Sequence, residues 1–181
     1  MATEWEPAFK VCYHCGSPEI EREAASVFAC RQCGKHLFVN PVSAVAGVLV
    51  DAEERILLLE RAREPAKGKL GLPGGFLDPG ETGEEGLRRE IREETGLEIG
   101  GVQYLGSFPN NYVYDGTTYL VLDLFFWARI ESFADARALD EVAGICPINV
   151  NEIDFEELAF SSIKKALTKF RQEFPIKLAN D

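Results

Sequence analysis

The sequence predicts an α/β domain that follows a small metal-binding ribbon. Three observations lead to this expectation: five segments are strand-length and apolar, two segments have helical signals, and four of the five cysteines form two C-x2-C pairs. A chain of 181 residues has room for one such domain and a small accessory module. We expect the ribbon to comprise residues 1–39 and the larger domain residues 40–181.

The cysteine pairs have the spacing of a zinc ribbon. Each pair reads C-x2-C-G and 14 residues separate the two, the thiols being Cys12, Cys15, Cys30 and Cys33. The glycine after each pair permits a tight turn that directs backbone N–H groups toward sulfur. Four thiolates complete a tetrahedral shell, so the expected Zn²⁺ is structural. The alternatives for the cysteines are a redox C-x-x-C motif, two disulfides or a metal-free ribbon. If a metal is bound, His14 or His36 could replace one of the thiols as a ligand.

Five segments after the ribbon are predicted strands, because they are short, apolar and rich in β-branched or aromatic residues. They are residues 42–50, 55–61, 102–108, 118–130 and 145–150. Near the C-terminus, apolar residues repeat every three to five positions and a proline follows them: Leu158, Ile163, Leu167, Phe170, Phe174 and Pro175. This periodicity predicts an amphipathic helix that packs on the sheet. Cys146 is expected to be a small buried hydrophobe.

A further helix is predicted between a capping-box pair and a glycine stop. Thr82 and Glu85 form the pair, so the helix should begin at Gly83, and Gly96 is a typical left-handed terminator after Thr95. Leu87 and Ile91 lie four residues apart on this helix and should face the core.

Three carboxylates crowd one face of this helix. Glu90, Glu93 and Glu94 lie at positions i, i+3 and i+4, where like charges repel unless cations lie among them. Oxygen ligands on a rigid helix suit Mg²⁺ or Mn²⁺, and Gly75 lets its carbonyl approach the same metal. The alternative is a solvated acidic face.

Residues 75–97 place these glutamates in a longer pattern, G-x5-E-x7-R-E-U-x-E-E-x-G-U, where U is aliphatic. The match has no departure, and the chain therefore resembles the Nudix hydrolases. The resemblance implies an α/β/α sandwich around a mixed sheet. It also implies metal-dependent hydrolysis of the pyrophosphate bond in a nucleoside diphosphate derivative, of the class of ADP-ribose, FAD, NADH or a nucleotide sugar.

The same resemblance implies roles for individual residues. Glu93 and Glu94 would be metal ligands and Glu90 a ligand or base, while Arg89 would hold a glutamate by a bidentate pair and Glu81 would tie the loop to the helix. Related enzymes often recruit one more acid to bind metal or activate water. Among the late acids we choose Glu141, with a solvated loop residue as the alternative.

Substrate recognition is expected outside this pattern. Residues 107–116 combine aromatic rings with amides, so Tyr112 and Tyr114 are candidates to stack on a base; an ordinary hairpin loop is the alternative. Arg61 and Lys69 are candidates to contact substrate phosphates, with plain solvent exposure as their alternative. A ribbon before a Nudix domain also occurs in bacterial NADH pyrophosphatases, but their S-Q-P-W-P-F-P-x-S motif is missing at residues 106–112. This suggests a relative that cleaves another nucleoside diphosphate derivative.

Charge and composition limit the partners. A net charge of −11 argues against sequence-independent binding of nucleic acid, and it would repel a pyrophosphate unless divalent cations supplied local attraction. The N-terminal residues lack a basic start and an apolar stretch, so we expect a cytoplasmic protein that binds no membrane. A monomer and a homodimer both stay open.

Two other functions stay open as well. A non-catalytic nucleotide sensor that regulates transcription would need a DNA-binding module, whereas only about 30 residues follow Asp154 and the glutamate pattern is intact. The second function is removal of a nucleotide cap from RNA, in which the ribbon would bind the RNA. Residues 1–40 carry four Lys or Arg residues against five glutamates, which is not a basic footprint.

Overall fold

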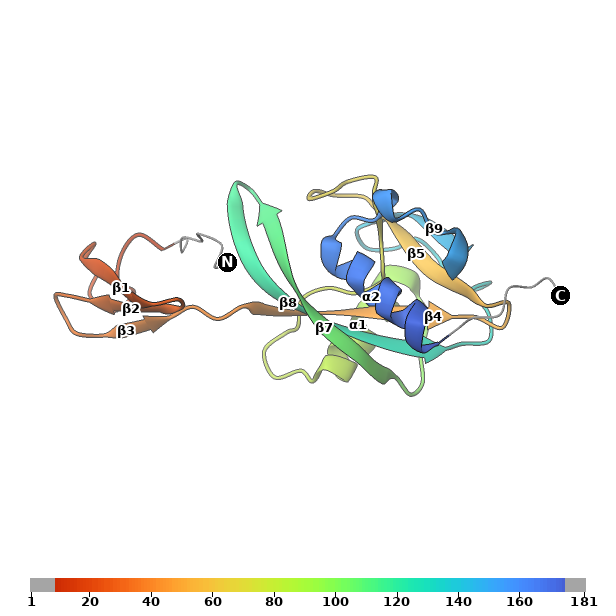
Figure 1. Cartoon of the computed structure of the whole chain (residues 1–181), viewed down its shortest axis with the longest axis horizontal. Helices are drawn as coiled ribbons and strands as arrows, with labels where there is room; N and C mark the ends of the chain where they lie inside the picture. The colour runs from red at the N-terminus through yellow and green to blue at the C-terminus, as the bar shows by residue number, and fades with distance from the viewer. Residues whose placement is uncertain (1–8, 175–181) are drawn as a thin grey trace.

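A mixed six-stranded sheet forms the centre of the larger module (Figure 1). The computed structural model describes residues 9–174. The sheet has the order β6-β5-β4-β8-β7, and β9 pairs with β5. Its strands are β4 (Val42–Val50), β5 (Arg55–Arg61), β6 (Leu70–Gly71), β7 (Gln103–Tyr114), β8 (Thr117–Arg129) and β9 (Val142–Asn149).

One helix covers each face of this sheet. Helix α1 (Gly83–Thr95) buries Leu87 and Ile91 in one apolar cluster, and α2 (Ser161–Glu173) buries Leu167 and Phe170 in another. Strand β8 contributes to both clusters because successive side chains point to opposite faces, and its neighbouring Phe125 and Phe126 accordingly join different clusters. The predicted α/β/α sandwich is confirmed.

The sheet opens between β4 and β5. Strand β4 pairs with β8 in parallel along its whole length, but it meets β5 only at Val50 and Ile56. Residues 73–77 run beside the free half of β4 instead, where Val45 N donates to Gly75 O at 2.8 Å. The loop that leads into α1 therefore lies in the opening of the sheet, next to the start of β4.

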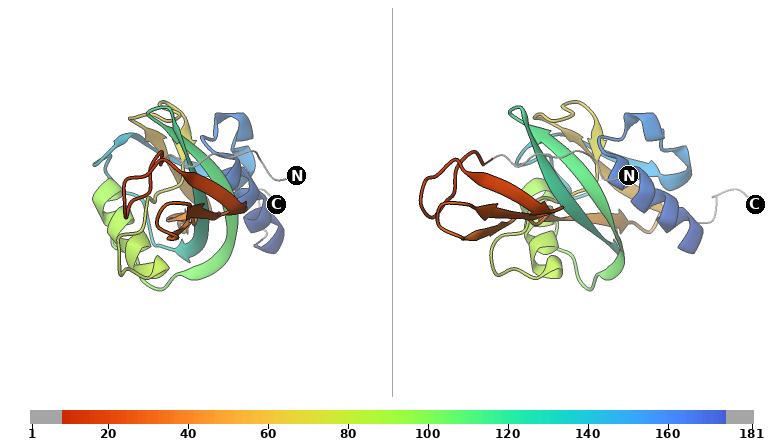
Figure 2. Two further views of the ribbon diagram at one scale, coloured as in Figure 1. Left: turned by 90° about the vertical axis from the view of Figure 1, so that its left-hand side faces the viewer. Right: turned by 60° about the vertical axis from the view of Figure 1, so that its left-hand side comes forward.

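The ribbon is a three-stranded antiparallel sheet of β1 (Ile20–Ala24), β2 (Val27–Cys30) and β3 (His36–Phe38). Its small core contains Phe28 and Leu37 together with Cys12 and Cys30. Figures 1 and 2 show this sheet at one end of the molecule, joined to β4 by a short connection. The expected boundary at residues 39 and 40 falls in that connection.

Two expectations about local structure were wrong. The strand expected at residues 102–108 is longer, because β7 continues to Tyr114 in register with β8. The alternative of a hairpin loop over residues 107–116 therefore does not hold, and only Asp115 and Gly116, both with positive φ, make the turn. Alternating aromatic and β-branched residues favour this extended hairpin. The C-terminal helix begins at Ser161, so Leu158 precedes it and bridges to β6. Pro175 lies outside the described residues. Within residues 9–174, both α-helices are too short to cross a membrane.

Candidate active site and cysteine cluster

Helix α1 is fixed at both ends by the predicted caps. Glu85 N donates to Thr82 Oγ1 at 3.2 Å, and Thr82 N donates to the Glu85 carboxylate at 2.9 Å. At the other end Gly96 has φ of 72° and its N–H donates to Arg92 O. Because both ends and the buried face are fixed, the direction of the acidic face is fixed too.

Arg89 organises the acidic face. Its guanidinium makes a bidentate pair with Glu81, with Nε to Oε1 at 2.7 Å and Nη2 to Oε2 at 2.8 Å. Nη1 also donates to Glu90 at 2.8 Å and to Glu93 at 3.1 Å, and Nη2 donates to Phe76 O at 3.0 Å. One cation thus orients three carboxylates and the loop before the helix.

Glu81 ties that loop to the helix. Besides its pair with Arg89, its carboxylate accepts the backbone N–H of Asp78 at 2.9 Å. The hydrogen bonds from Arg89 and from Asp78 N lower the pKa of Glu81 to about 2. Glu81 therefore stays ionised and serves as a fixed anchor.

Two glycines let the loop lie close to its neighbours, Gly75 to α1 and Gly74 to β4. A Cβ on Gly75 would lie 2.6 Å from a Glu90 carboxylate oxygen, and a Cβ on Gly74, whose φ is +147°, would lie 2.1 Å from Val45 O. The N–H of Gly74 donates to Glu94 at 2.8 Å. The backbone of the loop is thus in contact with the carboxylates of the helix. Carbonyl and carboxylate oxygens can therefore bind one metal ion together.

Desolvation disfavours the ionised form of two of these carboxylates, Glu90 and Glu94. Desolvation raises the pKa of Glu94 to about 8, against the hydrogen bond from Gly74 N, and it also raises the pKa of Glu90 against the pull of Arg89. The Glu93 side chain is about half exposed. Carboxylate and carbonyl oxygens gathered in this way fit a hard divalent cation, whose charge would favour the ionised form of each glutamate.

A pocket of about 410 Å³ lies in the opening of the sheet. It brings together eight of the residues that the sequence suggested for this site: Arg61, Gly75, Arg89, Glu90, Glu93, Glu94, Tyr112 and Glu141. Lys69 and Tyr114 are not among the described residues that line it. Lys69 Nζ contacts Glu157 at 3.2 Å, and Tyr114 lies at the exposed end of the β7–β8 hairpin.

Arg61 and Glu141 lie near the C-terminal end of α1, where Leu139 N donates to Glu94 O at 3.0 Å and the charges of both side chains act on Glu94. Arg61 Nε donates to Pro65 O at 2.8 Å, and its guanidinium lies 5.1 Å from the centre of the Phe160 ring. Its charge lowers the pKa of Glu94, against the stronger effect of burial. Glu141 has φ of 56° and its carboxylate accepts from Arg63 at 2.6 Å.

Sequence reasoning missed the other half of the pocket. Asn110 and Asp123 line it as buried polar residues, and Phe160 forms an aromatic row with Tyr112 and Phe76, with ring centres 5.7 and 5.5 Å apart. A signal existed for Asp123, because it is the single charged residue between Thr117 and Ala128 in an apolar segment.

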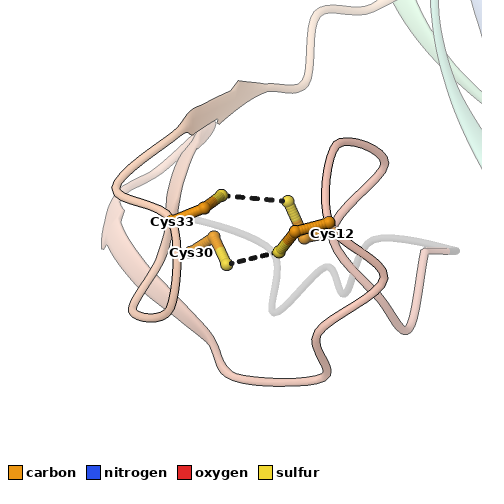
Figure 3. Close-up of side chains that lie close together, drawn as sticks. Cys12, Cys30 and Cys33 are labelled. Atoms are coloured by element: carbon orange, nitrogen blue, oxygen red, sulfur yellow. Dashed lines mark hydrogen bonds between the residues drawn. The ribbon is translucent and has the colours of Figure 1, made fainter.

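The four cysteines of the ribbon converge. Their Sγ atoms all lie within 4.8 Å of one another, with Cys12 to Cys33 at 3.8 Å and Cys15 to Cys30 at 3.6 Å (Figure 3). These distances are too long for disulfides and close to the separation of about 3.8 Å between tetrahedral ligands at 2.3 Å from zinc.

The two turns that carry these cysteines have the same geometry. Gly16 N donates to Cys12 O and Gly34 N to Cys30 O, each at 2.8 Å, and both glycines have φ near 70°. The backbone N–H of Cys33 lowers the pKa of the Cys30 thiol to about 7, against some desolvation. The hydrogen bond from Ser17 N lowers the pKa of the Cys15 thiol, but burial and the neighbouring thiols outweigh it and raise that pKa to about 12. The turn at Cys30 therefore favours a thiolate, which is the form that binds metal. The alternative ligand His36 instead contacts Glu23 at 3.1 Å.

Three curated relatives match parts of the chain. Nudix hydrolase 19 of Arabidopsis thaliana is 31% identical over 169 residues, 91% of this chain. An ADP-ribose pyrophosphatase of Methanocaldococcus jannaschii is 49% identical over 61 residues, 34% of this chain, and the NAD-capped RNA hydrolase NudC of Pseudomonas aeruginosa is 33% identical over 113 residues, 59% of this chain. The matched regions span only 35% to 39% of the lengths of these relatives.

Solved structures share the fold. A NUDIX hydrolase from Nitrosomonas europaea superposes with a TM-score of 0.68 and 24% identity, over 92% of this chain and 93% of that one. The family model of the NUDIX domain matches residues 40–170, which is most of the chain. The chain therefore belongs to the NUDIX family.

Proposed function

We propose that the chain hydrolyses the pyrophosphate bond of a nucleoside diphosphate derivative with the help of Mg²⁺ or Mn²⁺. The observation that carries this proposal is the contact between the Gly74-Gly75 loop and the partly buried carboxylates of Glu90 and Glu94 at the wall of a pocket. Such a site has all-oxygen donors and an open side toward ligand, as metal-assisted hydrolysis requires.

Glu90, Glu93 and Glu94 would hold the metal, together with the carbonyl of Gly75. That carbonyl already accepts the N–H of Val45, and its second lone pair stays available. When bound, the metal supplies the positive charge that attracts a diphosphate to an acidic protein and stabilises the charge of the transition state.

Three other side chains would orient the metal ligands, contact the phosphates and activate the water. Arg89 keeps Glu90 and Glu93 oriented, so that the ligand geometry exists before substrate arrives. Arg61, held by Pro65 O and Phe160, would contact the phosphates. Glu141, whose carboxylate accepts from Arg63, would take a proton from the attacking water.

The aromatic row supports a nucleotide as the substrate. Phe76, Tyr112 and Phe160 offer a stacking surface on the same pocket as the glutamates. The likeness to an ADP-ribose pyrophosphatase favours ADP-ribose within the class that also includes FAD, NADH and nucleotide sugars.

A screen of the purified protein tests this function. The protein is incubated with Mg²⁺ or Mn²⁺ and a panel of nucleoside diphosphate derivatives, products are identified by mass, and ¹⁸O-labelled water locates the attacked phosphorus. We expect cleavage of the pyrophosphate bond in at least one compound, and turnover that is lower by roughly 100-fold or more in the Glu93→Gln protein. Absence of metal-dependent cleavage across the panel would overturn the proposal.

Cap removal from RNA is a second candidate, favoured by the likeness to an NAD-capped RNA hydrolase. The ribbon offers little positive charge for RNA, because Arg31 pairs with Glu21 at 2.7 Å and three glutamates lie on or beside β1. A capped RNA belongs in the same panel. RNA binding that weakens steeply with salt would support this function, whereas salt-insensitive turnover of small molecules would support the first.

For the ribbon we propose a structural Zn²⁺ held by Cys12, Cys15, Cys30 and Cys33. The supporting observations are the mutual Sγ distances and the matching turns. Four thiolates leave no coordination position for water or substrate, so this metal would stabilise the small sheet and take no part in hydrolysis. Elemental analysis of protein prepared without chelator should find about one zinc per chain.

A further inference from the structure

The half of the pocket away from α1 contains two buried polar side chains. Asn110 on β7 is 8% exposed and Asp123 on β8 is 9% exposed, and both line the pocket. Neither has a task in the chemistry proposed above. Buried polar groups are costly unless they are satisfied, so their presence in a ligand pocket calls for a physical reason.

The register of the hairpin places both residues on one face. Asn110 pairs with Val121 across the two strands, and Asp123 lies two residues farther along β8 on the same face as Val121. They are therefore diagonal neighbours of an antiparallel pair, close enough for both side chains to contact one ligand.

Apolar and aromatic groups surround this pair. Val121, Phe125 and Ile163 line the same part of the pocket, and Phe76, Tyr112 and Phe160 continue it as a row of rings. A flat heteroaromatic ring can stack on such a row while its polar edge meets the two polar side chains.

The carboxylate of Asp123 has room for another donor. Burial raises the pKa of Asp123, and the side chains of Ser162 and Asn110 favour the charged form only in part. An ionised carboxylate has about four acceptor positions, so a ligand N–H would find a free one and would offset the desolvation.

We infer that Asn110 and Asp123 select a purine base with an exocyclic amino group, which donates to the Asp123 carboxylate while the Asn110 amide contacts the same edge. Adenine and guanine both carry such an amino group. Hypoxanthine lacks it and presents a carbonyl oxygen or a C–H at the same position, so only its ring N1–H remains as a donor toward the carboxylate. The inference rests on the proposed nucleotide substrate and adds which bases the pocket accepts.

Calorimetric titration with AMP, GMP and IMP at equal Mg²⁺ tests this selection without turnover, because the three compounds differ only in the base. We expect the tighter of AMP and GMP to bind at least about tenfold more tightly than IMP. In Asp123→Asn the new amide can donate to the hypoxanthine oxygen, so this ratio should fall to about one or invert. Asp115→Asn makes the same chemical change in the hairpin turn, outside the pocket, and should keep the wild-type ratio.

Equal affinity of the wild-type protein for all three nucleotides, no binding of any of them, or an unchanged ratio in a folded Asp123→Asn protein would overturn the inference. If that variant does not fold in thermal denaturation, Asn110→Leu provides the second test and should lose several-fold affinity for the preferred nucleotide. An unchanged affinity there would contradict the inference. Base selection without any hydrolysis would refute only the proposed function, and hydrolysis without base selection would refute only this inference.

Discussion

The cysteine cluster and the glutamate cluster are two ligand sets built in different ways. The four thiols come from two turns of the ribbon that have the same geometry, and their Sγ atoms converge on one common position. The carboxylates come from one face of α1 and need a loop that runs beside β4 to complete the set. Soft sulfur ligands in a closed shell suit a structural zinc, whereas hard oxygen ligands beside a pocket suit a catalytic Mg²⁺ or Mn²⁺.

The comparison teaches that closure decides the role of each site. Four thiolates would fill the whole coordination shell of a zinc ion, so a metal bound there would only hold the ribbon together. The glutamates line a pocket of about 410 Å³, so one side of their cluster is open to a ligand. Burial disfavours the ionised form of the Glu94 carboxylate, and a bound cation would offset this cost. The predictions below separate the two sites, from the largest expected effect to the smallest.

The largest effect should follow from neutralising a glutamate of α1. We expect Glu93→Gln and Glu94→Gln each to lower kcat by roughly 100-fold or more, because an amide weakens the hold on the metal that stabilises the transition state. Glu84→Gln, on the first turn of the same helix and outside the pocket, is the matched control. Steady-state kinetics at saturating Mg²⁺ measure the change. Near wild-type turnover in either variant would show that the assigned metal site is wrong.

Loss of a thiol should act on the ribbon alone. In Cys33→Ser we expect the zinc content to fall and the amides of β1, β2 and β3 to exchange rapidly with solvent, because zinc supplies the folding free energy of such small modules. Cys146→Ser changes a cysteine of β9, outside the cluster, and should leave both readouts unchanged. Slow exchange in a zinc-free Cys33→Ser ribbon would mean that the module folds without metal.

The stability of the metal-free protein should depend on Glu94. Its pKa in the folded state is raised from 4.5 to about 8 by burial, so protonation favours the folded state. The resulting stability is full below about pH 4.5 and is lost as the pH rises through about 8. In buffer prepared without Mg²⁺ or Mn²⁺ we expect Tm to fall over this range, and Glu94→Gln to reduce the slope. An identical slope in the variant would contradict the assigned burial.

The smallest effect should follow from Glu141. If its carboxylate accepts a proton from the attacking water, Glu141→Gln should lower kcat and leave KM nearly unchanged. Glu131→Gln, in the loop after β8, provides a control of the same chemistry. Unchanged kinetics in Glu141→Gln, together with a collapse of turnover in Glu90→Gln, would assign the base role to α1.

Local spacing is sufficient to predict much of both sites. The ends of α1 follow from Thr82, Glu85 and Gly96, and the cysteine turns follow from C-x2-C-G, because each depends on contacts within a few residues. The individual strands and helices follow from their periodicity, whereas the sandwich was implied by the resemblance to the Nudix hydrolases.

Long-range register is what the sequence did not disclose. Tyr112 and Tyr114 seemed equivalent candidates, yet only Tyr112 lines the pocket, because β7 continues as a strand and carries Tyr114 out to the hairpin end. The presence of Asn110 and Asp123 in the same pocket likewise depends on how β7 aligns with β8. Strand alignment of this kind is set by tertiary packing and leaves little trace in a single sequence.

The most direct test measures zinc content and Mg²⁺-dependent turnover in the same preparations of wild-type, Glu93→Gln and Cys33→Ser protein. Independent sites predict that Glu93→Gln retains about one zinc per chain while its turnover falls by roughly 100-fold or more. They also predict that Cys33→Ser loses zinc and retains turnover with Mg²⁺. Loss of both properties together in either variant would contradict the separation of a closed structural site from an open catalytic one.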